Sequence, residues 1–88
     1  GGTEANLSAM VTAREHWRSQ DENRKHTRGI IISAISAHSS VRSMAKVIDA
    51  DVISIPTEDR FEGWQLQEKL DSLTSEERSR VFAVIATG

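Results

Sequence analysis

The residues best suited to chemistry in this 88-residue chain include a glycine-rich stretch, GGTE, at its beginning. Gly2 and Thr3 would place backbone N–H groups and a hydroxyl at the start of a helix. Such a turn can bind a phosphate, because glycine allows close approach and the free N–H groups of a helix's first turn attract an anion. The stretch also fits a tag remnant followed by a helix, so both interpretations stay open.

His38 is the second candidate, because it follows an apolar run that ends in the turn 36–38. The other two histidines lie elsewhere: His16 falls within a predicted helix and His26 within a charged loop. A histidine in this position could contact a bound ligand, or it could simply cap or begin the next helix. The sequence alone leaves both interpretations open.

The elements that must position these residues follow from apolar spacing. One helix is predicted from Thr3 to about Gln20, since its apolar residues recur at helical intervals and form one face: Leu7, Met10, Val11 and Trp17. The polar stretch 18–28 is predicted to be a solvated helix end and loop. Three short apolar runs, 29–35, 51–56 and 80–88, predict strands buried on both faces, and Pro56 marks the end of the second.

Two more helical segments separate these strands. Spacing of three and four residues predicts a helix within 37–50, from Val41, Met44, Ala45 and Ile48, and another that contains Leu66, Leu70 and Leu73. Thr74 with Glu77 three residues later predicts a capping box and one or two further turns. The stretch TEDRFEG, residues 57–63, is predicted to be a solvent-facing loop.

Alternation of helices and buried strands predicts an α/β fold, with a parallel sheet covered by helices on its faces. Ligands of such sheets bind beyond the carboxyl ends of the strands. This rule selects the turn 36–38, the loop after Pro56, and Thr87 with Gly88 at the end of the last strand. The start of the first helix would join them if it packs at the same edge.

Composition excludes several classes of function. The net charge of −2, without a basic stripe, argues against nucleic-acid binding. With no cysteine there is no disulfide or thiolate metal site, and the histidines and carboxylates show no ligand spacing, so no metal is expected. The sequence has no signal-peptide pattern and no run long enough to span a membrane, which predicts a soluble cytoplasmic protein of one small domain.

Taken together, the blocks GGTEANLSAM…ARE, AHSSVRSMAKVI and VFAVIATG resemble the group II pyridoxal-phosphate-dependent amino acid decarboxylases of fold type I. The resemblance covers essentially the whole chain. It implies that residues 1–88 are a single partial domain, an internal segment of the large cofactor-binding domain of a carboxy-lyase. It also implies that the first strand lies between the other two, that the last strand has an open edge, and that the parent protein is a homodimer acting on an amino acid.

The resemblance assigns roles to four residues. Gly2 and Thr3 match the family's phosphate-binding turn, His38 matches a catalytic histidine that stacks on the cofactor ring, and Thr87 matches a threonine beside that ring. The family's aspartate for the pyridine nitrogen and its Schiff-base lysine have no counterpart, since Lys25, Lys46 and Lys69 do not occupy the lysine motif.

The chain alone is therefore expected to be inactive and to bind pyridoxal 5'-phosphate weakly or not at all. The alternative is a stand-alone α/β binding or structural module that retains an anion site. A dinucleotide-binding unit ranks last, because the chain lacks a GxGxxG turn after a first strand.

Overall fold

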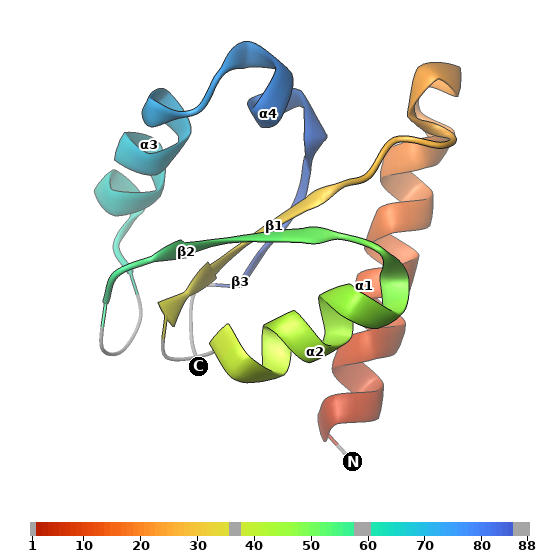
Figure 1. Cartoon of the computed structure of the whole chain (residues 1–88), viewed down its shortest axis with the longest axis horizontal. Coiled ribbons are helices and arrows are strands. Elements are labelled where there is room, and N and C mark those ends of the chain that lie inside the picture. Colours follow the sequence, from red (N-terminus) through yellow and green to blue (C-terminus); the bar gives the residue numbers. More distant parts are fainter. Residues whose placement is uncertain (1, 36–37, 58–60, 86–88) are drawn as a thin grey trace.

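A computed structural model describes the backbone of residues 2–35, 38–57 and 61–85, and the side chains of these residues except 2–6 and 38. Three strands and four α-helices alternate along the chain, with one short 3-10 helix, η1, after the first helix (Figure 1). In order they are α1 (Gly2–Ser19), η1 (Glu22–Arg24), β1 (Ile30–Ala34), α2 (His38–Ile48), β2 (Asp51–Ile55), α3 (Gly63–Ser72), α4 (Ser75–Arg80) and β3 (Val81–Ile85).

The three strands form one parallel sheet in the order β2-β1-β3. This confirms the predicted α/β class and the order implied by the family resemblance. Every residue of the central strand β1 is buried, as its continuous apolar run indicated. The outer strands β2 and β3 are half-buried over most of their length, because each has a strand neighbour on one side only among the described residues.

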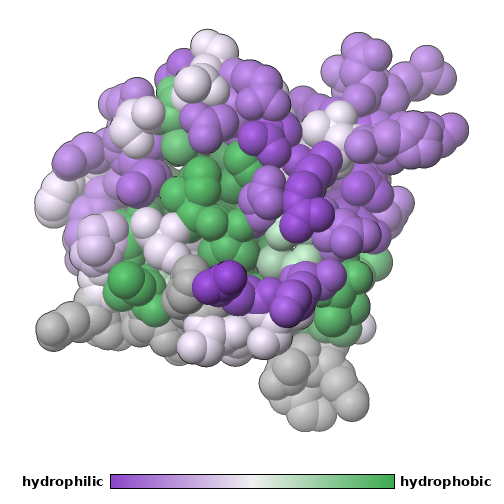
Figure 2. Space-filling view, viewed as in Figure 1, coloured by the Kyte–Doolittle hydropathy of each residue, from purple (hydrophilic) through white to green (hydrophobic). Residues whose placement is uncertain are grey.

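Helices cover both faces of the sheet, and each face has its own hydrophobic cluster. On one face, Ile31 packs with residues of α2 such as Val41 and Met44, and with Leu7 and Met10 of α1. On the other face, Ile32 packs among residues of β2, α3 and the segment before α3. The alternation of side chains along β1 thus separates an α1/α2 face from an α3 face. Hydrophobic residues remain visible in the middle of the view in Figure 2, surrounded by hydrophilic ones.

Strand β3 contains a β-bulge near its contact with α1. Ile30 pairs with Val81 but Ile31 pairs with Ala83, so Phe82 is an extra residue on β3. Phe82 packs on the α1/α2 face, where its ring lies 6.0 Å from that of Trp17 at an angle of 36°. This tilted aromatic contact packs the last turns of α1 against the start of β3.

The polar stretch after α1 is more ordered than the predicted loop. Asp21 caps η1 by accepting a hydrogen bond from the backbone N–H of Asn23 at 2.9 Å. The guanidinium of Arg24 lies 4.9 Å from the centre of the Trp17 ring, and Arg18 donates to the carbonyl of Thr27. Sequence periodicity could not predict the contact between Arg24 and Trp17, because it depends on the arginine side chain folding back over the aromatic ring.

The segments around α3 and α4 confirm one prediction and correct another. Thr74 and Glu77 form the predicted capping box, with hydrogen bonds of 3.0 and 3.1 Å between each backbone N–H and the other's side chain. The prediction that 57–63 faces solvent is wrong at Phe61, which is 7% exposed and belongs to the cluster of the α3 face. Among the described residues, no helix combines the length and apolar character needed to cross a membrane.

Candidate functional site

The carboxyl edge of the sheet is the candidate site, and the described parts of four elements meet it. Because the strands are parallel, β1, β2 and β3 end at the same edge, at Ala34, Ile55 and Ile85. Helix α2 begins there with His38, directly after the turn that follows β1. Figure 1 shows the first turn of α1 at the lower end of the view.

Hydrogen bonds at the other end of α1 establish its direction. Near the end of α1, Arg14 donates to the carbonyl of Ile48, and Arg18 donates to the carbonyl of Thr27. Both acceptors precede strands, so the last turns of α1 lie at the amino edge. The helix has 18 residues and is about 27 Å long, so its first turn points toward the carboxyl edge.

The structure places one of the four predicted site residues, His38, at this edge by its backbone, because His38 is the first residue of α2. Gly2 and Thr3 form the first turn of α1, which runs toward this edge. Thr87 lies outside the described residues, as do Gly88 and residues 36–37. That the start of the first helix joins the strand ends stays a prediction.

The donors at this edge suit an anion. Free backbone N–H groups at the start of α2 lie at this edge, and the dipole of α2 adds positive potential there. The first turn of α2 contains no acidic residue.

Ser33 is a residue at this end of β1 that sequence reasoning did not single out. It is fully buried, and its hydroxyl has no hydrogen-bond partner among the described residues. By strand alternation it shares the α1/α2 face with Ile31, one residue before the strand ends. A buried hydroxyl without a partner costs about 1–3 kcal/mol. The signal in the sequence was a polar residue inside an otherwise apolar run.

The amino edge of the sheet is occupied by ion pairs within the chain. Arg28 donates to Asp51 at 2.7 Å, and Arg80 approaches the other oxygen of that carboxylate at 3.4 Å. The hydrogen bond from Arg28 holds the pKa of Asp51 below its ordinary value, and the same bond raises the pKa of Arg28. Arg80 also pairs with Glu76 at 2.8 Å. These charges compensate one another and hold the ends of α4, β1 and β2 together.

None of the three lysines lies at the start of α2. Lys25 follows η1 before β1, and Lys69 is in the last turn of α3, where it lines a hollow with Ile55 and Pro56. Lys46 is in the last turn of α2 and is exposed. Within the described ranges there is also no group of three or more histidines and carboxylates that could hold a metal ion.

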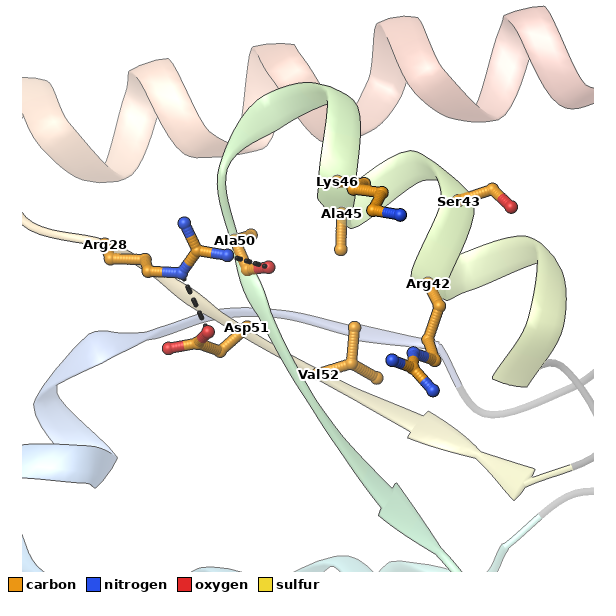
Figure 3. A pocket seen from close by; sticks show the side chains of 8 residues that line it. All are labelled: Arg28, Arg42, Ser43, Ala45, Lys46, Ala50, Asp51 and Val52. Atoms are coloured by element: carbon orange, nitrogen blue, oxygen red, sulfur yellow. Dashed lines mark hydrogen bonds and ion pairs between the residues drawn. The ribbon is translucent and has the colours of Figure 1, made fainter.

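A hollow lined by described residues lies away from the predicted edge. Its volume is about 640 Å³, and it lies between α2 and β2, with Arg28, Arg42, Lys46 and Asp51 among the residues that line it (Figure 3). A second hollow of about 300 Å³ lies on the opposite side of β2, against α3. Sequence reasoning predicted neither, because both form only where a helix packs beside an outer strand.

Comparison with known proteins gives one relevant similarity. The chain is 31% identical over 90 aligned positions to a tryptophan decarboxylase of Clostridium sporogenes (strain ATCC 15579). The match includes 98% of this chain and 21% of that protein, so the chain spans about a fifth of the length of this relative. No family model matches the chain, and no solved structure matches it. The chain is thus distantly similar to one part of a decarboxylase.

Proposed function

We propose that this chain forms part of the pyridoxal-phosphate-binding domain of an amino acid decarboxylase. The observation that carries the proposal is the similarity to a tryptophan decarboxylase along nearly the whole chain. The three-strand parallel sheet, with the start of α2 at its carboxyl edge, supports it, because this arrangement suits a phosphorylated cofactor. The substrate of the whole protein would be an amino acid, and the whole protein would be a homodimer.

In this proposal the chain holds the cofactor without bonding to it. Backbone N–H groups at Gly2 and Thr3, with the Thr3 hydroxyl, would bind the phosphate. The imidazole of His38 would pack on the pyridine ring and orient it, and Thr87 would contribute beside the ring. The cofactor, when bound, supplies an electron-withdrawing ring that stabilises the carbanion left by loss of carbon dioxide.

The catalytic contribution of this chain is positioning. His38 would cover one face of a ring held at the start of α2, exclude water from that face and move a proton during the reaction. The lysine that bonds to the cofactor must come from residues outside this sequence, because Lys25, Lys46 and Lys69 lie elsewhere. The chain alone is therefore expected to bind the cofactor weakly and to lack decarboxylase activity.

Pyridoxamine 5'-phosphate is the appropriate probe, because it has no aldehyde and cannot react with surface lysines. We expect the Thr3→Val/His38→Ala variant to lose about tenfold or more in affinity, measured by calorimetric titration. The matched control is Thr27→Val/His26→Ala, which changes the same residue types at the amino edge and should leave affinity unchanged. Pyridoxamine without phosphate should bind far more weakly. Equal affinity of the two double variants would refute the assigned site.

A further inference from the structure

The outer edge of β2 combines a free strand edge with two hollows. Among the described residues β2 pairs only with β1, so its other side has no strand neighbour. The pairing of β1 with β2 is continuous from Asp51 to Ile55, without a bulge. The other outer strand, β3, is interrupted by the bulge at Phe82. A regular strand edge is a template for a further strand, whereas a bulge twists the edge and weakens such pairing.

The hollow on the α2 side of this edge is basic. Figure 3 shows Arg42 beside Val52 of β2, and Lys46 one helical turn further along α2. Both side chains are exposed, and neither has a hydrogen-bond or ion-pair partner within the described part of the chain. Arg28 adds a third cation, although Asp51 compensates it. Because no β1 residue lines the hollow, it lies on the outer side of β2.

The hollow on the α3 side of the same edge is more apolar. Ile55, Pro56 and Trp64 line it, and Trp64 is 66% exposed, which is unusual for so large an aromatic side chain. Exposed tryptophan beside a shallow hollow is characteristic of protein interaction surfaces. Glu68 and Lys69 also line this hollow, with opposite charges.

We propose that the outer edge of β2 binds an extended segment of a partner protein whose side chains alternate between acidic and apolar. Such a segment would add a fourth strand through backbone hydrogen bonds. Because successive side chains of a strand point to opposite faces, its carboxylates would meet Arg42 and Lys46 while its apolar side chains would contact Trp64.

Charge favours this occupant over a second copy of the chain. Antiparallel pairing of β2 with its own copy would place both α2 helices on one face, with Arg42 and Lys46 of each copy close together. On that face β2 itself presents the uncharged Val52 and Ser54, and Asp51, which also lines the hollow, is already paired with Arg28 and Arg80. Like charges brought together at an interface disfavour the complex.

The test uses a fluorescein-labelled peptide in which glutamate alternates with valine. Fluorescence anisotropy measures the binding of this peptide to the whole chain. We expect saturable binding that weakens about tenfold or more in Arg42→Gln/Lys46→Gln. The control Lys25→Gln/Arg78→Gln removes the same net charge from exposed positions away from β2 and should bind as the unaltered chain does. Trp64→Ala should also weaken binding, and N-methylation of alternate peptide nitrogens should abolish it.

Three results would overturn the proposal. The first is equal affinity for the unaltered chain and Arg42→Gln/Lys46→Gln, with circular dichroism showing that both are folded. The second is equal binding of a peptide that alternates lysine with valine. The third is self-association in sedimentation velocity that strengthens in Arg42→Gln/Lys46→Gln, because this would assign the edge to a second copy.

Discussion

The two edges of the sheet use charge in opposite ways. At the amino edge, arginines and carboxylates pair with one another, through Arg28, Asp51, Arg80 and Glu76. At the carboxyl edge, the start of α2 at His38 offers backbone donors, and α2 has no acidic residue in its first turn. The charged residues of the amino edge therefore serve to stabilise the fold. The donors of the carboxyl edge instead suit an anionic ligand.

This difference predicts that substitutions at the amino edge change the free energy of unfolding. Substitutions of the proposed site residues should instead change ligand affinity.

The largest effect is expected for Trp17→Ala. Trp17 is buried, contacts Phe82 and lies under the guanidinium of Arg24, so its removal leaves a large cavity between α1 and β3. We expect a loss of about 3–5 kcal/mol in the free energy of unfolding. Urea denaturation followed by circular dichroism measures it without depending on tryptophan fluorescence. Trp64→Ala is the matched control and should cost less than about 0.5 kcal/mol, because Trp64 is exposed.

Gly29→Ala should have the next largest effect. A Cβ atom at Gly29 would lie 2.7 Å from Cε1 of Phe82, so the ring and its contact with Trp17 would have to shift. We expect a loss of about 1–3 kcal/mol. Gly63→Ala is the control, since a Cβ atom there meets nothing within 4 Å. If both variants unfold at the same urea concentration, the close packing at the bulge does not contribute to stability.

Asp51→Asn tests the ion pairs of the amino edge. Removing the charge should cost about 1 kcal/mol at neutral pH, because Asp51 is half-exposed and water screens its two pairs. Since the folded pKa of Asp51 is lowered, its contribution is present above about pH 5 and is lost as the pH falls through that folded pKa.

The variant should therefore show a smaller loss of stability than the unaltered chain between pH 7 and strongly acidic pH. Denaturation curves at both pH values measure this difference. Asp71→Asn should resemble the unaltered chain, because Asp71 is exposed and its hydrogen bond from Gln67 can be kept by an amide. An equal pH dependence in Asp51→Asn would contradict the account.

Asp49→Gly should stabilise the chain by about 0.5 kcal/mol. Asp49 follows α2 with φ at 57°, and the N–H of Ala50 donates to the carbonyl of Ala45 at 2.9 Å, which is a Schellman motif. Glycine adopts this left-handed conformation without steric cost. Asp49→Ala is the control and should give no gain, because alanine meets the same steric conflict. A gain in thermal midpoint from both variants would point instead to removal of the charge.

Sequence patterns predicted most of the fold for a clear physical reason. Period-two and period-3.6 spacing of apolar residues reflects which face is buried, so the spacing around Ile31 and Val41 is enough to indicate a strand and a helix. Contacts between residues of different elements follow no period. The bulge at Phe82, the burial of Phe61 and the arginine over Trp17 all depend on tertiary packing, and none was predicted.

The sequence could predict where the candidate site lies, but not which ligand it binds. The rule for parallel sheets places it at the carboxyl edge, and α1 runs toward that edge. Which ligand occupies this edge depends on residues such as His38 and Thr87, whose roles rest on family resemblance. Ser33 shows a further limit, because a buried hydroxyl without a partner cannot be recognised from its residue type alone.

Amide chemical shifts of the ¹⁵N-labelled chain, titrated with pyridoxamine 5'-phosphate, test the central claim most directly. The account predicts that backbone amides of residues 2–4 and 38–40 shift with a single affinity, while those of 28–30 and 50–52 do not move. Pyridoxamine without phosphate should produce much smaller shifts at the same amides. Shifts at the amino edge instead, or none at the carboxyl edge at saturating ligand, would contradict the assignment of this edge as the cofactor site.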